Sequence, residues 1–259
     1  MQRRHATLRQ GIHVTDAGAI AARLTVMQEV AHRLDGLRAI GTVVSVERGG
    51  EIYAEGDRAE SWYRLLSGVG CTSRITADGR RQIGGFLFAD DVFGFDAPER
   101  HGFGAEALTA VTLMRFPRTG IEALAREDAD FGSCLRQLAY DRLSAAHGQL
   151  LLLGRKSASE RLATFILEMR DRMSAGDLIE LPVSRVDIAD YLGLTFETVS
   201  RTFSLLRQLQ MIALPSPSCV RVLDCCALGE LAAGDTKDVF PAVEPRRAHA
   251  SAIGVMALV

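Results

Sequence analysis

Short apolar runs separated by glycine-bearing turns fill the chain from residue 26 to residue 118, and this pattern predicts a domain built of β-strands. Thr42–Val46, Trp62–Leu66 and Gln82–Phe88 are three of these runs. Between two runs, the segment Ala77-Asp78-Gly79-Arg80 predicts a tight hairpin, because Asp-Gly tolerates the positive φ that such turns demand. Many short strands with frequent turns favour a sandwich or a barrel.

The pattern becomes helical between residues 119 and 154. Small and apolar residues recur there at alternating intervals of four and three, a spacing typical of a coiled-coil seam. We therefore predict a dimerisation helix, although the same stripe could instead dock on the β domain. The seam consists of Ala139, Leu143, Ala146, Leu150 and Leu153. The neighbouring row makes a poorer seam and is expected to lean on the β domain; it contains Leu135, Leu138, Arg142, Gln149 and Leu152.

Residues 155–233 carry the pattern of a winged helix-turn-helix. Ser157 or Ser159 can cap a first helix. We expect this helix to run to Met173, followed by a strand at Asp177–Val183, a wing made of Met211–Leu214 and Val220–Leu223, and a last helix at Ala227–Ala233. Residues 1–25 are predicted to form an N-terminal arm, and the tail at residues 234–259 has no recognisable role.

The stretch from Ser184 to Phe203 predicts two short helices broken at Gly193, because glycine takes a turn conformation that larger residues resist. The residues expected to pack the helices together are Ile188, Ala189, Leu192, Leu194 and Val199. Spacings of three and four place three polar residues on one face of the second helix: Glu197, Ser200 and Arg201. Such a helix fits the DNA major groove, about 12 Å wide, and presents its N-terminal side chains to base edges.

The composition allows this interpretation without adding to it. The 259 residues can hold two domains, and 47% hydrophobic and 24% charged residues are ordinary for a globular protein. The net charge is −2, and residues 155–210 contain eight basic and eight acidic side chains. Affinity for phosphate must then come from the local placement of basic side chains, from helix N-termini and from dimerisation, because the overall charge does not supply it.

Several classes of protein are disfavoured. No apolar run approaches the roughly 20 residues of a membrane span, and no apolar signal core follows the charged start. Five cysteines do not make a disulfide framework, so we expect a cytoplasmic protein. An enzyme is not expected either, because no nucleophile–base set stands out and Gly49-Gly50 is not a phosphate-binding loop.

Over residues 40–233 the chain resembles the Crp/Fnr superfamily of bacterial transcription regulators, and within it the Fnr/FixK branch. The motifs that carry the resemblance are Glu55-Gly-Asp, Tyr63-Arg-Leu-Leu-Ser-Gly, the Asp78-Gly79 hairpin, Asp91-Val-Phe-Gly-Phe-Asp-Ala, Leu150 through Ala163, and Asp187 through Arg201. The resemblance implies an α+β protein with a cyclic-nucleotide-binding-like β roll, a long dimerisation helix and a C-terminal winged helix-turn-helix. It further implies a homodimeric activator of genes for low-oxygen or nitrogen-oxide respiration.

The Glu-x-x-Ser-Arg pattern separates this branch from the cyclic-AMP receptors and implies a palindrome of TTGA-type half-sites. Arg201 can bond guanine O6 and N7 together, Glu197 can accept from a cytosine amino group, and Ser200 can contact a neighbouring base. Alternatively, Glu197 and Arg201 form only an exposed helix pair worth about 0.3–0.5 kcal/mol. The residues expected to contact the DNA backbone are Ser184, Arg185, Thr195, Thr198 and Arg207. RNA polymerase is a further expected partner, through the loop Asp96–Phe103, although this segment could instead be a plain surface loop.

The sensor part departs from the family. Gly94 is followed by Phe95 instead of the glutamate of cyclic-nucleotide binders, and the later segment Phe103–Leu108 has Glu106 but no arginine for the phosphate. No cysteine precedes Cys71, so the N-terminal ligand set of an iron–sulfur cluster is missing. We therefore predict no bound cofactor and no metal.

Three alternatives stay open at this point. A haem-dependent nitric-oxide sensor would need one of His13, His32, His101 and His147. A redox role would need one of Cys219, Cys225 and Cys226, which could also be ordinary reduced thiols, whereas Cys71 is expected to be a small buried hydrophobic residue. The chain could also be a ligand-binding module whose helix-turn-helix only mediates assembly.

Overall fold

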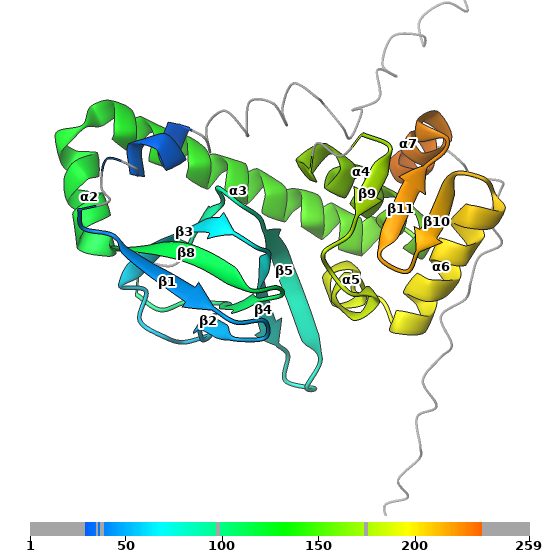
Figure 1. The fold of residues 1–259 in the computed structure, drawn as a ribbon, viewed down its shortest axis with the longest axis horizontal. Coiled ribbons are helices and arrows are strands. Elements are labelled where there is room, and N and C mark those ends of the chain that lie inside the picture. Colours follow the sequence, from blue (N-terminus) through cyan, green and yellow to red (C-terminus); the bar gives the residue numbers. More distant parts are fainter. Residues whose placement is uncertain (1–28, 35, 37–38, 97–98, 174–175, 235–259) are drawn as a thin grey trace, which may run out of the picture.

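The computed structural model describes residues 29–34, 36, 39–96, 99–173 and 176–234. The predicted N-terminal arm at residues 1–25, and all of the predicted tail except Gly234, lie outside the described residues. Within them the chain folds into a β domain, a long helix and a small helical domain with its own sheet (Figure 1).

The β domain consists of two four-stranded antiparallel sheets, with strand orders β1-β8-β3-β6 and β2-β7-β4-β5. Its strands are β1 (Thr42–Val46), β2 (Glu51–Tyr53), β3 (Ser61–Ser67), β4 (Gly70–Ile75), β5 (Arg81–Leu87), β6 (Val92–Phe93), β7 (Gly104–Ala107) and β8 (Val111–Pro117). The hairpin predicted from Asp78-Gly79 is confirmed: Gly79 has a φ of +81°, and the Thr76 amide donates to the Arg80 carbonyl at 2.8 Å. The domain is the predicted β roll.

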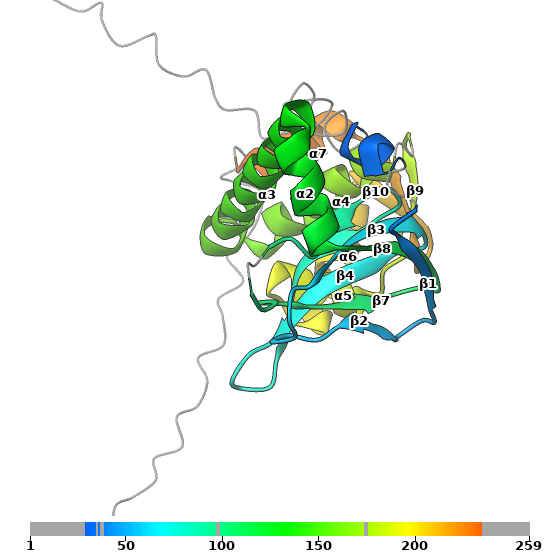
Figure 2. The ribbon, with the colours of Figure 1, turned by 90° about the vertical axis from the view of Figure 1, so that its left-hand side faces the viewer.

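The helical region expected at residues 119–154 is two helices rather than one. Helix α2 (Arg118–Glu127) and helix α3 (Ala129–Arg155) are separated by Asp128, whose backbone is extended. The Asp128 carboxylate caps α3 by accepting from the amides of Asp130 and Phe131, and it also binds Arg33 at 2.6 Å. The side chain of Asp128 thus stabilises a sharp corner, around which α2 turns back along the β roll (Figure 2).

The region assigned to β-strands from residue 26 also needs a correction, because residues 29–34 are helical. Val30 and Leu34 are fully buried, and they pack in one cluster with Ile121 of α2 and Phe131 of α3. This short helix therefore belongs with the helical layer, and the β pattern begins only at β1.

The C-terminal part is the predicted winged helix-turn-helix. Its elements are α4 (Ala158–Met173), β9 (Leu178–Glu180), α5 (Arg185–Leu192), α6 (Phe196–Gln208), β10 (Ile212–Ser216), β11 (Cys219–Val222) and α7 (Cys225–Ala233). The strands form an antiparallel sheet in the order β10-β11-β9, which confirms the wing. Ser157 caps α4, with its hydroxyl accepting from the Glu160 amide and Glu160 accepting in return from the Ser157 amide.

The roll and the winged helix-turn-helix share one hydrophobic core. Cys71, Ile83 and Phe86 of β4 and β5, with Val69 just before β4, belong to the same buried cluster as residues of the helices α4, α5 and α6. Phe86 lies 5.1 Å from Tyr191 of α5 between ring centroids. The β5 strand therefore lies directly beside α5, as Figure 1 shows.

Candidate DNA-binding site

Helix α5 begins at a capping box. The Ser184 hydroxyl accepts from the Asp187 amide at 3.1 Å, and the Asp187 carboxylate accepts from the Ser184 amide at 2.9 Å. The helix ends at Gly193, which has φ +62° and ψ +40°, a left-handed conformation that an L side chain would strain. The predicted break between the two helices is confirmed at this residue.

Helices α5 and α6 cross through the apolar positions that the sequence predicted. Ile188, Leu192 and Val199 are fully buried, and Ala189 is nearly so. The Ala189 carbonyl accepts from the amide of Leu194 at 3.0 Å, which closes the turn against the small side chain. The two helices therefore form one packed unit.

Helix α6 presents its polar residues to solvent. Thr195 caps the helix by accepting from the Thr198 amide at 3.2 Å, and the side chains of Glu197 and Arg201 are exposed one turn apart. Ser200 lies half-buried on the same face. Arg201 Nε approaches the backbone carbonyl of Glu197 at 3.4 Å, and no ion pair joins the two side chains, both of which the structure describes. The exposed helix pair considered as the alternative is therefore not formed.

The residues expected to contact the DNA backbone fall into two groups. Thr195 and Thr198 share a hydroxyl contact of 3.0 Å at the start of α6, and Arg207 is exposed in its last turn. Ser184 is exposed, but its hydroxyl also donates to Asp187 at 2.6 Å, so the cap uses it fully. Arg207 and the exposed Thr195 thus lie where a phosphate could approach, whereas Thr198 is only partly exposed and shares its hydroxyl with Thr195.

Arg185 has a role different from the predicted one. Its guanidinium carbon lies 3.1 Å from the centroid of the Phe203 ring, and Nη2 donates to the Pro217 carbonyl in the wing at 3.1 Å. Burial lowers the pKa of Arg185 to about 10, so the group stays charged at neutral pH while packed on an aromatic face. Arg185 thus joins α5, α6 and the wing instead of facing a DNA phosphate.

Sequence reasoning missed Phe196, the first residue of α6, whose side chain is 49% exposed. A phenylalanine in an amphipathic helix is ordinarily interpreted as a core residue. Phe196 nevertheless lies four residues before Ser200, on the face that carries the polar tips, and this spacing could have identified it. An exposed apolar ring there can contact the methyl group of thymine.

The seam residues of α3 lie on the surface of the chain. Leu143 is 55% and Leu150 70% exposed, and Ala139 and Ala146 are exposed as well, whereas Leu153 packs partly against the shared core. The stripe therefore does not dock on the β domain over most of its length. It offers an apolar face about four helical turns long.

The neighbouring row of α3 packs inward, as expected. Leu138 and Leu152 are buried. Arg142 donates to the Val92 carbonyl at 2.9 Å in the roll, and Gln149 donates to the Tyr191 carbonyl at 2.9 Å in α5. One side of α3 thus holds both the roll and the helix-turn-helix, and the opposite side carries the seam.

Aromatic rings fill the interior of the roll. Tyr63 stacks on Phe93 with centroids 5.3 Å apart, and Tyr53 stacks on His101 at 3.8 Å. A Cβ on Gly94, which has a φ of +84°, would approach the Tyr63 ring to 2.7 Å. Phe95 packs on Trp62 at 5.0 Å, so the segment that holds phosphate in cyclic-nucleotide binders here serves ring packing.

The histidines and cysteines differ in exposure. His101 is buried, and burial lowers its pKa despite the nearby Asp96 carboxylate. His32 and His147 are exposed, and His13 lies outside the described residues. Burial raises the pKa of the Cys71 thiol to about 12, so it stays protonated. The remaining cysteines are half-buried (Cys134), buried (Cys219) and exposed (Cys225 and Cys226).

The described residues form neither a metal-binding cluster nor a membrane-spanning helix. No group of three or more His, Cys, Asp or Glu side chains there is arranged to hold a metal ion. None of the helices in that part of the chain has the length and apolar character that a bilayer crossing requires.

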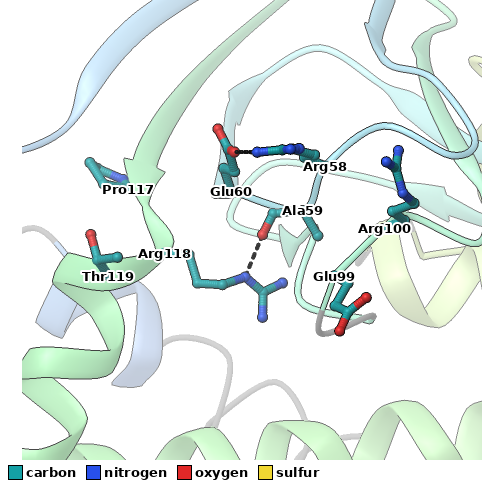
Figure 3. Close-up of a pocket in the computed structure, with 8 residues that line it drawn as sticks. All are labelled: Arg58, Ala59, Glu60, Glu99, Arg100, Pro117, Arg118 and Thr119. Carbon is teal, nitrogen blue, oxygen red and sulfur yellow. Dashed lines mark hydrogen bonds and ion pairs between the residues drawn. The ribbon is translucent and has the colours of Figure 1, made fainter.

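A pocket lies on the outer surface of the roll, beside the start of α2 (Figure 3). Its arginines hold the walls together: Arg118 donates to the Ala59 carbonyl, Arg58 pairs with Glu60 at 3.5 Å, and Arg100 donates to the Gly56 carbonyl at 2.7 Å. The lining is completed by Glu99, Pro117 and Thr119. Of these contacts, the bond from Arg100 to Gly56 ties the loop before β7 to the segment between β2 and β3.

Comparison with known proteins matches both parts of this architecture. Residues 160–231 match the family model described as a Crp-like helix-turn-helix domain, and residues 43–128 match that of a cyclic nucleotide-binding domain. The nitrogen fixation regulation protein FixK of Azorhizobium caulinodans is 38% identical over 215 residues, which cover 81% of this chain and 87% of the relative. The chain belongs to the Crp/Fnr superfamily of transcription regulators. Members of this family are not enzymes; they bind DNA and act as dimers.

Two further relatives support the FixK-like assignment. The transcriptional activatory protein AadR of Rhodopseudomonas palustris is 38% identical over 186 residues, covering 70% of this chain and 77% of the relative. The solved structure of FixK2 from Bradyrhizobium japonicum superimposes with a TM-score of 0.72 at 36% identity, over 74% of this chain and 97% of the other. The α+β fold predicted from the sequence is therefore confirmed. This FixK-like chain is a transcription regulator with a helix-turn-helix DNA-binding domain.

Proposed function

We propose that this protein is a homodimeric, cytoplasmic activator that reads a palindrome of TTGA-type half-sites. The observation that carries the proposal is the outer face of α6, where Glu197 and Arg201 are exposed and not paired with each other. The N-terminus of α6 adds the positive end of a helix dipole, which favours the approach of phosphate. The close relatives named as regulators and activators support the same role.

Each side chain on this face has a base that it suits. The planar fork of Arg201 bonds guanine O6 and N7, and Glu197 accepts from the cytosine amino group on the opposite strand. Ser200 contacts a neighbouring base, and the exposed ring of Phe196 contacts a thymine methyl. Thr195, Thr198 and Arg207 bind phosphates and set the register of the helix.

Dimerisation supplies the second reading helix. The stripe from Ala139 to Leu153 on α3 is exposed over most of its length, and burial against a second copy removes its leucines from water. A two-fold axis along this seam then places two copies of α6 in successive major grooves, about 34 Å apart. The palindrome mirrors that symmetry.

The regulator acts without its own cofactor, and the amount of regulator in the cell is set by a separate sensing system that acts before it. The rings of Tyr53, Tyr63 and Phe93 in the roll and the use of Phe95 in packing support this view. Its target genes serve low-oxygen or nitrogen-oxide respiration. Haem is tested by an optical spectrum with metal analysis of protein purified without air, where a Soret band would contradict the proposal.

Contact with RNA polymerase is assigned to the loop Asp96–Phe103, of which residues 97 and 98 lie outside the described residues. The described part is held against the roll, because the Ala59 amide donates to the Glu99 carbonyl at 2.9 Å and the His101 amide to the Asp57 carbonyl at 2.9 Å. Glu99 and Arg100 are exposed on this anchored loop. Replacing both with alanine should reduce transcription and leave DNA binding intact.

The central experiment compares binding of a TTGA palindrome and a scrambled duplex by fluorescence anisotropy. Arg201→Ala should lower affinity for the palindrome by about 1–3 kcal/mol and leave the scrambled duplex unaffected. Arg126→Ala removes an equal charge from the exposed surface of α2 and serves as the matched control. An unchanged preference in Arg201→Ala, or wild-type protein with no preference for the palindrome, would contradict the proposal.

A further inference from the structure

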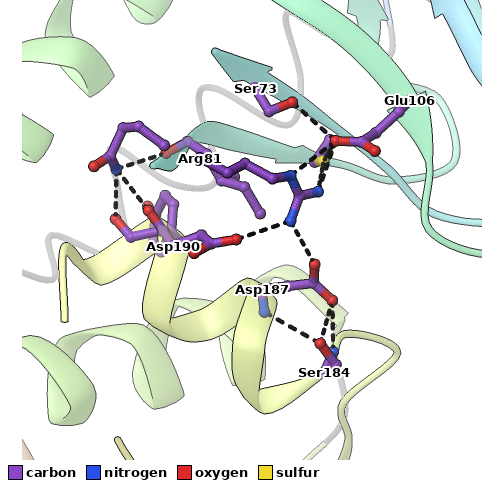
Figure 4. A network of polar contacts seen from close by, with 10 residues as sticks. Ser73, Arg81, Glu106, Ser184, Asp187 and Asp190 are labelled. Atoms are coloured by element: carbon purple, nitrogen blue, oxygen red, sulfur yellow. Dashed lines mark hydrogen bonds and ion pairs between the residues drawn. The ribbon is translucent and has the colours of Figure 1, made fainter. Parts of the chain in front are cut away.

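One arginine of the roll reaches into the helix-turn-helix. Arg81, the first residue of β5, donates from Nη1 to Asp187 at 2.8 Å and to Asp190 at 3.0 Å, both on α5 (Figure 4). Its Nη2 and Nε donate to Glu106 of β7 at 2.7 and 3.0 Å. The guanidinium thus joins two strands of the roll to the first helix of the DNA-binding unit.

This cluster contains more negative than positive charge. One guanidinium faces three carboxylates, and the exposed fractions of these side chains lie between 15% and 31%. Burial lowers the pKa of Arg81, but the hydrogen bonds that Arg81 donates to Asp187 and Glu106 outweigh it and leave that pKa raised. Without Arg81, three partly buried carboxylates would repel one another across the junction.

The end of α5 is held from three directions. A helix leaves its last carbonyls without partners inside the helix. Here Gln82 of β5 donates to the Asp190 carbonyl at 2.7 Å, Gln149 of α3 donates to the Tyr191 carbonyl at 2.9 Å, and Arg161 of α4 donates to the Leu192 carbonyl at 2.8 Å. The orientation of α5 is therefore set by the roll and the long helix together.

We propose that Arg81 is a positioning residue for DNA recognition, which clamps α5 to the roll and so sets the separation of the two α6 helices in the dimer. The inference rests on the proposed function, because it assumes a dimer that reads a palindrome. Its physical basis is a chain of rigid contacts. The roll is fixed to α3 through Leu138 and Arg142, Arg81 fixes α5 to the roll, and α5 and α6 share a packed core.

Arg80 provides a matched control one residue away. Its side chain is 82% exposed and pairs only with Asp78 in the hairpin turn, at 2.6 Å. Arg81→Gln and Arg80→Gln remove the same charge from the same hairpin. A difference between the two variants therefore reports the contacts with α5 and not the change in overall charge.

The first test uses the full-length protein without DNA, so that it does not depend on the proposed function. Amide hydrogen exchange in α5 should be about tenfold faster in Arg81→Gln than in wild type and unchanged in Arg80→Gln. Far-UV circular dichroism and exchange in β3 and β8 should stay at wild-type values, which shows that the roll is folded. Equal exchange in α5 for the two variants would overturn the inference.

The second test measures affinity for palindromes whose half-sites are separated by the optimal spacer or by one base pair more or less. Wild type and Arg80→Gln should discriminate strongly between spacers, whereas Arg81→Gln should lose about tenfold in affinity for the optimal spacer and discriminate less. A merely structural role would lower affinity for all spacers equally. Wild type that binds no palindrome would refute the proposed function, and the exchange experiment would still decide the role of Arg81.

A double variant distinguishes loss of the clamp from misfolding, because a misfolded protein would not be rescued by a second substitution. In Arg81→Gln, adding Asp190→Asn removes one of the repelling carboxylates and should restore part of the protection of α5 and of the spacer preference. Asp190→Asn alone should have a small effect, because Arg81 keeps Glu106 and Asp187. An additive double variant, with no restoration, would contradict the electrostatic basis of the clamp.

Discussion

The two helices of the helix-turn-helix look alike in sequence and are used in opposite ways. Both begin at a capped polar residue, and both carry acidic and basic side chains. On α5, the side chains of Ser184, Arg185, Asp187 and Asp190 all have partners inside the molecule. On α6, Glu197, Arg201 and Arg207 are exposed. Polar residues on a helix therefore do not by themselves indicate a binding face. The elements packed around the helix determine whether those side chains are exposed or have partners inside the molecule.

The largest effect should come from breaking the core that both helices share. Leu192→Ala removes a fully buried side chain and should destabilise the protein by about 2–5 kcal/mol, with α5 and α6 affected together. Urea unfolding measures the change. Val186→Ala, at a 52% exposed position on the same helix, should stay within about 0.5 kcal/mol, and a similar loss in both variants would contradict the packing described here.

A smaller effect is expected from a substitution on α6 that changes DNA recognition and leaves stability unchanged. Arg201→Lys keeps the charge on α6 but loses the planar fork, so discrimination against a half-site with its guanine replaced should fall by roughly 1–3 kcal/mol. Unfolding free energy should remain unchanged, because the side chain makes only a 3.4 Å contact with its own helix. Anisotropy titrations on the two duplexes measure the effect. Unchanged discrimination in the variant would contradict the assignment of Arg201 as a residue that contacts a base.

The cap of α5 should matter for stability alone. Ser184→Ala removes the two bonds that the Ser184 hydroxyl makes with Asp187, leaves the bond from the Ser184 amide to the Asp187 carboxylate, and should cost about 1 kcal/mol in unfolding free energy. The salt dependence of DNA binding should keep its slope, since a cap with its hydroxyl already used does not release counterions. A shallower slope would show that Ser184 also contacts a phosphate.

The smallest effect should be that of pH on the clamp. The pKa values of Glu106 and Asp187 are lowered: burial raises them, but hydrogen bonds from Arg81, Ser73 and Ser184 outweigh it. The stability that these carboxylates contribute is complete above their ordinary pKa values and is lost as pH falls through the lowered ones. Exchange protection of α5 should therefore not change between pH 8 and pH 5, whereas a loss near pH 6 would contradict this assignment.

Local patterns were sufficient for much of the fold. Strand β1 runs over the predicted Thr42–Val46, the Asp78-Gly79 turn closes the predicted hairpin, and Gly193 ends α5 where expected. In each case the decisive interaction lies within a few residues, so the sequence pattern carries it. The face of α6 with Glu197 and Arg201 was predictable for the same reason, since spacings of three and four determine which residues share a helix surface.

Long-range contacts escaped the sequence analysis. Asp128 caps α3 locally, but its carboxylate also binds Arg33, 95 residues away, and no local pattern indicates that contact. Arg185 turns inward because Phe203 and the wing offer it an aromatic face and a carbonyl. No periodicity reports such meetings, because they depend on how separate elements pack.

By itself, the sequence pattern determined a β-rich N-terminal part, a helical stretch and a winged helix-turn-helix, and which residues of α6 share a face, because these features depend on propensity, periodicity and turn chemistry over short distances. The β roll and the regulatory role were implied by the resemblance to the Crp/Fnr superfamily. Only the tertiary structure decided that β5 lies against α5 and that Arg81 meets Asp187, 106 residues further along the chain. The free energy of that contact arises from desolvation and charge pairing between elements, and neither exists until the two domains pack.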